Sequence, residues 1–574
     1  MNYLDHYREW LASDMLSEDE KQELREIADN DDEIRQRFSS YLSFGTAGLR
    51  GVMKVGMNAM NVHTVAYATQ GLAALILKED RAADGVVIAY DCRNNSSLFA
   101  RTAASVLAAN GIKVYIFDEL RPTPELSFAL RELKCVAGIN ITASHNPKQY
   151  NGYKAYWEDG AQLPPEHAET VSAEIAKLNI FTAIRMTDYR SAVLAGKINV
   201  IGSEIDEKYL AAVKEQTVNP GAIPAVADDL KIVYSPLHGT GYRLVPEILK
   251  RAGLKHLYTV DEQMQIDGNF PTVAKPNPEY PEVFKLGIEV ANRVGSDLII
   301  ATDPDADRVG VMTRAAGGGF ITITGNQMGA LLLDYIITAE EQAGTLPKDA
   351  YAVKTIVSTE LASKICREHG VTMYNVLTGF KFIGEVIKNY EAKGYGHFLL
   401  GFEESYGYLK GTYARDKDAV VASMLIAEMT AFYKAKNMTL SDALDHLYMR
   451  YGYCFEANEE VYMEGVDGPR QMAEFMDRMR NDPPKAFGCA SVAMIGDYEK
   501  ETMTTLATGK AEPTGLPKSN VLYYRLENND VIVIRPSGTE PKIKFYYLLL
   551  AKDKTDATQK YYGYRDSMAK LKKW

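Results

Sequence analysis

The chain has 574 residues and a mass of 63.8 kDa, which is too long for one hydrophobic core and predicts several domains. Its hydrophobic content of 46% and charged content of 24% are typical of an ordinary globular protein. A net charge of −12 argues against a nucleic-acid partner, because phosphate backbones bind to basic surfaces. A small anionic substrate is still allowed, since a local basic pocket can form in an acidic protein.

The cysteine pattern and the N-terminal sequence indicate where the protein works. The cysteines are scattered with no CxxC pair, which predicts reduced thiols and no zinc site. The start MNYLDHYREW lacks the zones of a signal peptide, and no uninterrupted apolar run reaches the roughly 18 residues of a membrane span. We therefore expect a cytoplasmic protein without a membrane partner.

The N-terminal segment from Asp5 to about Tyr41 is acidic, and its apolar positions recur at spacings of three and four, which predicts a pair of surface helices. The run FGTAGLRG follows, in which three glycines surround Arg50. Such a turn lets the backbone approach a ligand, and the Arg50 guanidinium can grip a phosphate through two hydrogen bonds. Taken alone, a flexible loop with an exposed arginine explains this segment equally well.

One plan occurs three times along the chain, in residues 85–118, 230–262 and 351–379. Each copy has an apolar strand, a polar turn, an amphipathic helix that ends at a glycine, and a second apolar strand. Such a unit implies a right-handed crossover in a parallel or mixed sheet, so we predict three similar α/β domains. Ligands in such folds bind at the carboxyl ends of the strands, which directs attention to the turns.

The strand-like run from Val136 to Ile141 leads into the loop TASHNP, which contains the candidate nucleophile Ser144. A serine–histidine–aspartate triad explains this loop poorly, because adjacent residues normally point apart and the GxSxG elbow is absent. Lys154 follows ten positions after Ser144, and its amine can take a proton from a hydroxyl if its pKa is lowered. A serine-capped turn with a surface lysine is the alternative.

The run SDLIIATDPDADRVGVM delivers Asp303, Asp305 and Asp307 from an apolar strand into one loop. Three close carboxylates repel one another unless a cation holds them. An EF-hand is rejected, because Arg308 and Arg314 stand where its glycine and glutamate belong. The oxygen ligands suit Mg²⁺, with a phosphate oxygen and waters completing the shell, whereas a solvated acidic turn is the alternative.

The third copy of the repeated plan leads to Lys381, and the later run GFEESYGYLKGTYARDKDA places Glu403 and Ser405 between glycines. Carboxylate and hydroxyl groups in such a loop suit the recognition of sugar hydroxyls. Arg415 and Lys417 add positive charge nearby. A helix start with ordinary surface ions explains these residues as well when the segment is taken alone.

The last domain begins near Tyr451 and contains VIVIRPSGTEPKIKFYYLLL, which predicts a strand, a tight loop and a second strand. The loop offers the Arg535 guanidinium, the Ser537 and Thr539 hydroxyls and the Gly538 amide, which together suit a phosphate. A hairpin turn with polar side chains is the alternative.

The motifs TASHNP, DPDADR, GFEES and RPSGTEP, in this order and at these separations, resemble the active-serine, metal, sugar and phosphate loops of the α-D-phosphohexomutases. The match covers nearly the whole chain and is most similar to the phosphoglucomutase branch that also contains phosphopentomutases. The resemblance implies an α/β fold of four domains around a central cleft, with three similar α/β sandwich domains and a smaller C-terminal α+β domain. We place these domains at residues 1–204, 205–322, 323–450 and 451–574.

The resemblance also implies a role for each motif residue. Ser144 would carry a phosphoryl group that binds Mg²⁺ together with Asp303, Asp305 and Asp307. His145 and Lys154 would be catalytic, with Lys154 as the general base, and Arg50 and Arg308 would hold the reacting phosphoryl group. The sugar hydroxyls and the other phosphate would bind to the remaining group, which comprises Lys381, Glu403, Ser405, Arg415, Lys417, Arg535, Ser537, Gly538 and Thr539.

The implied reaction is reversible phosphoryl transfer between the C1 and C6 hydroxyls of glucose phosphate, through glucose 1,6-bisphosphate that turns around in the cleft. Mg²⁺ and this bisphosphate are the expected cofactors, a sugar phosphate is the expected partner, and the protein is expected to be a monomer or a homodimer. Because both ends of the sugar must fit the site, the fourth domain is expected to hinge.

Several alternatives remain open. Phosphopentomutase and phosphomannomutase activities on the same fold come first, since Pro304, Phe402 and Tyr406 depart from the family pattern in the metal and sugar loops. A haloacid-dehalogenase-like phosphatase is suggested by an apolar strand followed by DPDAD, but it leaves the serine and phosphate loops unexplained. A non-catalytic sugar-phosphate sensor on the same fold is the last alternative.

Overall fold

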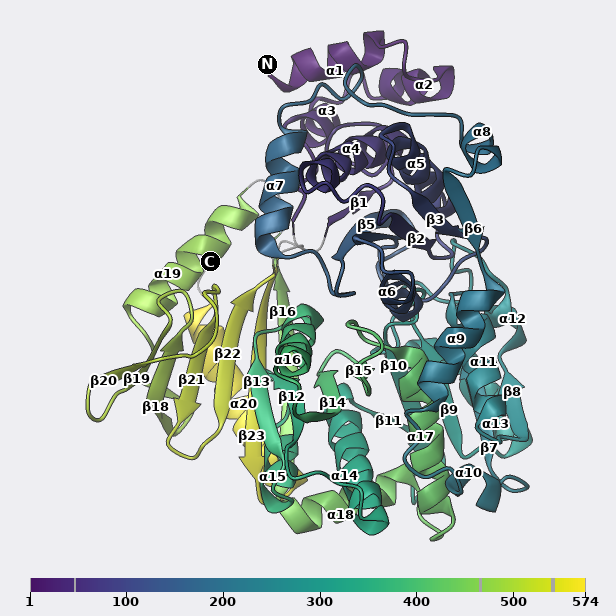
Figure 1. The fold of residues 1–574 in the computed structure, drawn as a ribbon. Coiled ribbons are helices and arrows are strands. Elements are labelled where there is room, and N and C mark those ends of the chain that lie inside the picture. Colours follow the sequence, from purple (N-terminus) through teal and green to yellow (C-terminus); the bar gives the residue numbers. More distant parts are fainter. Residues whose placement is uncertain (1, 46–47, 464–466, 538–541, 573–574) are drawn as a thin grey trace. The chain divides into compact units, whose positions relative to one another are not determined.

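The computed structural model describes residues 2–45, 48–463, 467–537 and 542–572, which form two compact units (Figure 1). The first unit comprises residues 1–323, 384–394 and 406–439. The second comprises residues 324–383, 395–405 and 440–574.

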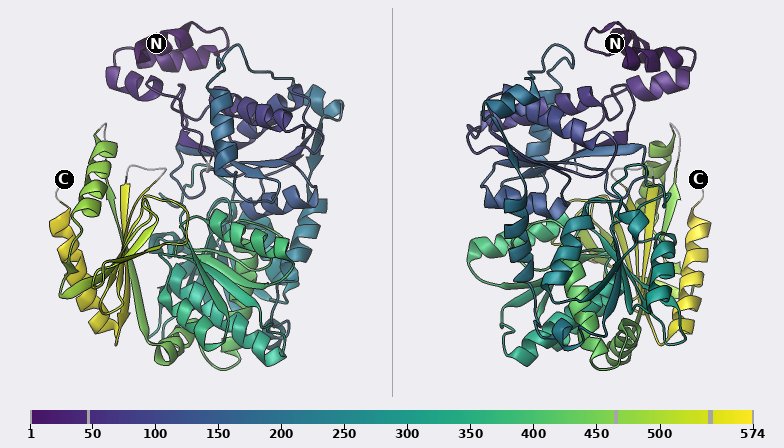
Figure 2. Two further views of the ribbon diagram at one scale, coloured as in Figure 1. Left: turned by 60° about the vertical axis from the view of Figure 1, so that its left-hand side comes forward. Right: turned by 90° about the vertical axis from the view of Figure 1, so that its right-hand side faces the viewer.

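Three helices, rather than the predicted pair, form the N-terminal layer of the first unit (Figure 2). They are α1 (Tyr3–Ala12), α2 (Glu18–Glu26) and α3 (Asp31–Phe38). The extra break occurs at Asn30, whose side chain accepts a hydrogen bond from the Glu33 amide and starts a new helix. Trp10 is only 1% exposed and packs in this layer with Phe38.

A six-stranded mixed sheet lies next to this layer in the order β1-β5-β4-β2-β3-β6. The strands are β1 (Leu49–Val52), β2 (Val86–Tyr90), β3 (Val114–Phe117), β4 (Ala137–Ile141), β5 (Tyr150–Trp157) and β6 (Ile198–Ile201). β5 is antiparallel to both neighbours, and the other pairs are parallel. The helices α4 (Val62–Lys78) and α5 (Ser96–Ala109) cover one face and α6 (Thr123–Glu132) covers the other (Figure 1).

The first unit also contains a five-stranded sheet in the order β11-β10-β9-β7-β8. Its strands are β7 (Lys231–Ser235), β8 (His256–Thr259), β9 (Leu298–Thr302), β10 (Val309–Arg314) and β11 (Phe320–Ile323). The longer helices of this region are α9 (Ser203–Lys214), α11 (Gly241–Arg251), α13 (Lys285–Val294) and α17 (Ala419–Lys434). The remaining elements of the unit are α7 (Pro165–Ile175), α8 (Tyr189–Leu194), α10 (Ala222–Ala225), α12 (Asp261–Met264), η1 (Pro281–Phe284) and β15 (Gly407–Leu409).

The second unit combines a parallel α/β segment with an antiparallel sheet. In the α/β segment, β12 (Ala350–Thr355) is parallel to both β13 (Thr372–Val376) and β14 (His397–Glu403). Its helices are α14 (Gly325–Ala343), α15 (Glu360–Glu368), α18 (Leu440–Tyr451) and the first turn of α16 (Phe380–Lys393), whose later residues belong to the first unit.

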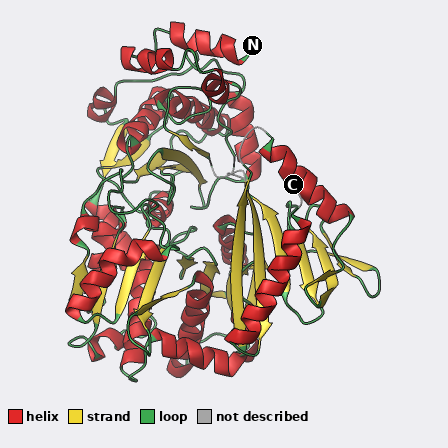
Figure 3. Cartoon of the chain, turned by 180° about the vertical axis from the view of Figure 1, so that it is seen from behind, coloured by secondary structure: helices red, strands yellow, loops and turns green. Residues whose placement is uncertain are grey.

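The C-terminal sheet has eight strands and is antiparallel (Figure 3). Its strands are β16 (Tyr453–Tyr462), β17 (Ala486–Phe487), β18 (Ala490–Asp497), β19 (Thr502–Thr505), β20 (Lys510–Pro513), β21 (Leu522–Leu526), β22 (Val531–Pro536) and β23 (Lys542–Ala551). Alternate residues of β22 and β23 pack into two different hydrophobic cores, because successive side chains of a strand point to opposite faces of the sheet. Ile532 and Ile534 pack with the helices α19 (Gly468–Asn481) and α20 (Lys554–Leu571), whereas Val531 and Val533 pack with Val357 of the α/β segment.

The structure confirms the predicted fold class of three α/β domains and a C-terminal antiparallel domain. Each repeated segment forms two parallel strands joined by a helix, namely β2-α5-β3, β7-α11-β8 and β12-α15-β13. The glycines that were expected to end the helices, Gly111, Gly253 and Gly370, all have positive φ. The exact domain boundaries stay a prediction. Among the described helices, none combines the length and the apolar composition that a bilayer-spanning segment needs.

We expect Trp10→Ala to destabilise the N-terminal layer by about 3–5 kcal/mol, because it removes a large buried ring from a packed core. The loss should appear as an earlier unfolding transition in a thermal melt. Met15→Ala is the matched control, since Met15 is 57% exposed in the same layer. Equal melting curves for the two variants would contradict the proposed packing.

Candidate active site

Ser144 lies in the turn between β4 and β5 and is only 3% exposed. Its backbone adopts the left-handed conformation with φ of +51°, and its amide donates a hydrogen bond to Thr142 Oγ1 at 2.8 Å. Ser144 Oγ donates to Asp303 Oδ2 at 2.8 Å. The turn also brings His145 Nδ1 within 3.1 Å of Ser144 Oγ, although adjacent side chains were expected to point apart. Because the aspartate contacts the serine instead of the histidine, this is not a serine–histidine–aspartate triad.

The loop after β9 gathers Asp303, Asp305 and Asp307, and all three side chains are buried. One carboxylate oxygen of each lies within 4.8 Å of those of the other two. Burial raises the pKa of Asp303, and the neighbouring negative charges of Asp305 and Asp307 raise it further. The predicted clustering of the three carboxylates is therefore present in the fold, and the group can hold a metal ion.

Two lysines supply positive charge to this carboxylate group. Lys154 Nζ donates to Asp305 Oδ2 at 2.7 Å and lies 3.7 Å from Asp307 Oδ2, and Lys417 Nζ lies 3.1 Å from Asp307 Oδ2. Burial lowers the pKa of Lys154, but the Asp305 and Asp307 carboxylates more than offset this effect and raise it overall. Lys154 is therefore an ammonium ion in this arrangement, and it can act as a base only after losing that proton.

The pKa of His145, unlike that of Lys154, is lowered overall. Burial lowers the pKa of His145 well below its usual value, and the positive charges of Arg308 and Arg50 lower it further. The imidazole is therefore neutral beside Ser144 Oγ.

The donor set around the aspartates fits a hard divalent cation. Asp305 Oδ1 and Asp307 Oδ1 are buried and accept no hydrogen bond from the described residues. A buried carboxylate oxygen without a hydrogen-bond donor is costly unless a cation satisfies it. Three carboxylates with oxygen donors alone suit Mg²⁺ better than a softer metal.

Sequence reasoning missed two residues that hold Asp305. The Thr123 amide donates to the Asp305 carbonyl, and Thr123 Oγ1 donates to Asp305 Oδ2, both at 2.8 Å. Asn140 Nδ2 in turn donates to Thr123 Oγ1 at 2.7 Å. The only sequence signal for this support was the polar Asn140 inside the apolar strand β4.

Two predicted phosphate-binding arginines lie beside the serine and metal loops. Arg50 Nη1 donates to Asn146 Oδ1 at 3.1 Å, which ties the glycine-rich segment to the serine loop. The Arg308 amide donates to Asp303 Oδ1 at 3.0 Å, and its Nη1 donates to Glu279 Oε1 at 2.6 Å. Thr46 and Ala47, within the same glycine-rich segment, lie outside the described residues.

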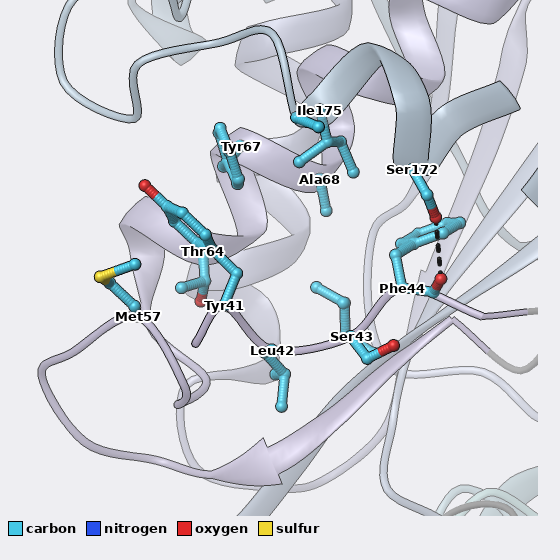
Figure 4. Close-up of a pocket in the computed structure, with 12 residues that line it drawn as sticks. Tyr41, Leu42, Ser43, Phe44, Met57, Thr64, Tyr67, Ala68, Ser172 and Ile175 are labelled. Atoms are coloured by element: carbon cyan, nitrogen blue, oxygen red, sulfur yellow. Dashed lines mark hydrogen bonds between the residues drawn. The ribbon is translucent and has the colours of Figure 1, made fainter. Parts of the chain in front are cut away.

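The chain leading to Arg50 runs past a cavity of about 280 Å³ (Figure 4). Tyr41 stacks on Tyr67 with ring centroids 4.9 Å apart, and Ser172 Oγ donates to the Phe44 carbonyl at 2.9 Å. These contacts anchor the segment on α4 and α7. The residues that line the cavity are uncharged, so a phosphate would find no counter-charge there.

In the second unit, the turn between β13 and α16 is hydrogen-bonded to two of the predicted substrate residues. The Gly379 amide donates to Glu403 Oε1 at 2.8 Å, and Arg535 Nη1 donates to Thr378 Oγ1 at 2.6 Å. Lys381 is the second residue of α16, and its Nζ lies 5.0 Å from the ring centroid of Phe382.

The other predicted substrate residues are placed differently. Ser405 is the second residue after the end of β14 and is half-buried. The Ser537 amide donates to the Lys542 carbonyl at 2.8 Å, whereas Gly538 and Thr539 lie outside the described residues. Arg415 is buried, and its guanidinium contacts Glu391 and carbonyls of its own loop.

The structure thus collects the predicted residues into two groups. The group in the first unit comprises Arg50, Ser144, His145, Lys154, Asp303, Asp305, Asp307, Arg308 and Lys417. The group in the second unit comprises Lys381, Glu403 and Arg535. The first group places a hydroxyl, a neutral imidazole and an ammonium around a candidate cation site, which suits phosphoryl transfer.

Comparisons with known proteins match the chain to one protein family. Three domain descriptions of the phosphoglucomutase/phosphomannomutase family, alpha/beta/alpha domains I, II and III, match residues 41–180, 207–318 and 324–451. A phosphoglucomutase of Staphylococcus saprophyticus is 38% identical over 531 residues, which cover 92% of this chain and 94% of the relative.

Solved structures share the fold at lower identity. The open form of pp63/parafusin, a phosphoglucomutase from Paramecium, is similar with a TM-score of 0.68 and 17% identity, covering 93% of this chain and 96% of that one. The N-acetylphosphoglucosamine mutase of Aspergillus fumigatus, solved in complex with GlcNAc-6P and magnesium, has a TM-score of 0.50 and 14% identity, covering 93% of this chain and 96% of that one.

We expect Asp307→Asn to weaken Mg²⁺ binding by about tenfold or more, because it removes a negative ligand charge from the carboxylate group. Isothermal titration with Mg²⁺, or competition against Mn²⁺ followed by electron paramagnetic resonance, measures the change. Asp261→Asn is the control, since Asp261 is exposed on α12. Unchanged affinity in Asp307→Asn would exclude this group as the metal site.

Proposed function

Since the chain belongs to the phosphoglucomutase/phosphomannomutase family, we propose that it transfers a phosphoryl group reversibly between the C1 and C6 hydroxyls of glucose phosphate. Its activity is that of a phosphoglucomutase, an isomerase, as the full-length relative indicates. One observation carries the mechanism: the buried Ser144 hydroxyl is hydrogen-bonded to Asp303 at the edge of the carboxylate group. In our proposal Ser144 carries the phosphoryl group.

The carboxylate group is the proposed Mg²⁺ site. Asp303, Asp305 and Asp307 would hold the ion together with an oxygen of the phosphoryl group on Ser144. Bound there, Mg²⁺ neutralises negative charge on the group that is transferred. The hydrogen-bond acceptors left open on Asp305 and Asp307 support this assignment, as does the magnesium in the Aspergillus fumigatus mutase of the same fold.

The transfer step breaks the bond between Ser144 Oγ and phosphorus and forms a bond from phosphorus to a sugar hydroxyl oxygen. The proton of that hydroxyl passes to a base and is then delivered to Ser144 Oγ, which ends the step as a hydroxyl. Lys154 is the proposed general base. It can accept a proton once the negative charge of Asp305 and Asp307, which raises its pKa, has been offset. His145, neutral and 3.1 Å from Ser144 Oγ, is the second proposed catalytic residue.

The remaining residues position the two ends of the substrate. Arg50 and Arg308 hold the reacting phosphoryl group, because their charge and forked geometry match its oxygens. Glu403 and Ser405 bind sugar hydroxyls, and Arg535 with Ser537 and its neighbours holds the other phosphate. Glucose 1,6-bisphosphate forms after the first transfer, turns around, and returns its other phosphoryl group to Ser144.

The free cysteines support a proposal for the cellular location of the protein. The five cysteines form no disulfide and three of them are buried. This arrangement supports a reducing compartment, so the cytoplasm is the proposed location. The oligomeric state remains the prediction of a monomer or homodimer.

We expect Ser144→Ala to abolish conversion of glucose 1-phosphate to glucose 6-phosphate, because no hydroxyl remains to carry the phosphoryl group. The assay contains Mg²⁺ and a trace of glucose 1,6-bisphosphate, and a coupled dehydrogenase reports glucose 6-phosphate. Ser13→Ala, in the N-terminal layer, is the control and should keep full activity.

Other outcomes point to the alternatives. If the natural chain is inactive on glucose 1-phosphate but converts ribose 1-phosphate or mannose 1-phosphate, the sugar assignment is wrong. If Ser144→Ala still releases inorganic phosphate while Asp303→Asn does not, the chain is a phosphatase with an aspartate nucleophile. Tight binding of a sugar phosphate without any turnover would make it a sensor.

A further inference from the structure

A buried arginine outside the predicted site lies under the serine loop. Arg93 is in the turn between β2 and α5, and its side chain is fully buried. Its guanidinium donates to four backbone carbonyls of that loop and the strand after it. Nη2 donates to the carbonyls of Ser144 and Asn146, and Nη1 donates to those of Pro147 and Tyr150 at 3.0 Å each.

These bonds act on the strained part of the loop. Ser144 has φ of +51°, a left-handed backbone conformation. Residues other than glycine adopt it rarely, and mostly where the surrounding structure holds them in it. The carbonyl of Ser144 itself is one of the four acceptors, so Arg93 fixes the peptide that follows the strained residue. The direction of Ser144 Oγ toward Asp303 depends on that peptide.

The guanidinium is itself held in place from two sides. Asp91 Oδ2 lies 3.2 Å from Arg93 Nε, and Asp91 Oδ1 accepts hydrogen bonds from the Arg93 amide and from Ser96 Oγ. The ring of Phe270 covers the planar group at 5.1 Å from Cζ. Asp91 fixes the edge of the guanidinium and Phe270 fixes its face.

The segment that carries Phe270 is in close contact with the turn that carries Arg93. A Cβ atom on Gly268 would lie only 2.5 Å from the Asn94 amide nitrogen, so a glycine is needed for this approach. Asn94 Nδ2 donates to Asn269 Oδ1 at 3.1 Å. The position of Arg93 is therefore set by the five-stranded sheet region as well as by its own turn.

We propose that Arg93 is a positioning residue that holds Ser144 in the geometry required for phosphoryl transfer. This inference rests on the proposed function and adds a residue that does not contact the reacting atoms. A lysine cannot replace Arg93, because one ammonium offers three donors from a single point and cannot span four carbonyls and a carboxylate.

The test is Arg93→Lys, with Arg101→Lys as the matched control. Arg101 lies on α5, is exposed, and has its guanidinium over the ring of Tyr189. Each protein is phosphorylated with glucose 1,6-bisphosphate, and intact-protein mass spectrometry gives the amount of phosphoenzyme. A single turnover is then followed with phosphoenzyme in excess over glucose 1-phosphate. At saturating phosphoenzyme, the first-order rate constant does not depend on the fraction of protein that is folded.

We expect Arg93→Lys to lower this rate constant about 10- to 100-fold, since a small displacement of a reacting group has an effect of that size. In steady state kcat should fall by the same factor, while KM for glucose 1-phosphate changes little. Arg101→Lys should match the natural chain. Equal single-turnover rates for Arg93→Lys and the natural chain would overturn the positioning role.

A second variant covers the case in which Arg93→Lys does not fold, as judged by circular dichroism. Asp91→Asn keeps the acceptor for the Arg93 amide and Ser96 but turns an amide donor toward Arg93 Nε. We expect the single-turnover rate constant to fall at least threefold, and an unchanged rate would overturn the inference. A natural chain without turnover would instead contradict the proposed function.

Discussion

The neutralisation of three buried carboxylates is the constraint on which the first unit depends. Asp303, Asp305 and Asp307 come within 4.8 Å of one another away from water, where like charges repel strongly and lose their hydration. Lys154 and Lys417 supply two positive charges, and the hydroxyl of Ser144 supplies a hydrogen bond. Asp305 Oδ1 and Asp307 Oδ1 receive no hydrogen bond from the described residues, so both oxygens are available to a divalent cation.

The two sheets of the first unit fix the positions of Ser144 and the three aspartates. β4 and β9 are wholly buried strands, and each ends in a polar turn that carries the functional groups. The backbone of each strand is fixed by its neighbours, so the turns begin from rigid points. Thr123, at the start of α6, also fixes Asp305 through its amide and hydroxyl. Rigid strands and short turns thereby place the candidate site residues at the ends of the strands.

The predicted substrate-binding residues of the second unit are held by a different construction. Its predicted binding residues come from a turn of a parallel sheet and from an antiparallel hairpin, and they meet at Thr378 and Gly379. The alternating cores of β22 and β23 secure that hairpin on both faces. A binding group assembled from two sheets can therefore keep a fixed geometry within the unit.

The amino-acid sequence alone was enough to predict the fold class and the clustering of most candidate site residues. The period of the apolar residues and the glycines after each helix specify strand–helix–strand units, because both signals are local. The motifs that contain Ser144 and Asp303 are also local, so their chemistry could be read directly. Three features could not be predicted in this way: the neutral state of His145, the protonated state of Lys154, and the contacts of Arg93 with the serine loop. Each depends on burial and on charges or carbonyls that are distant in the chain, and such neighbours exist only once the sheets have brought their turns together.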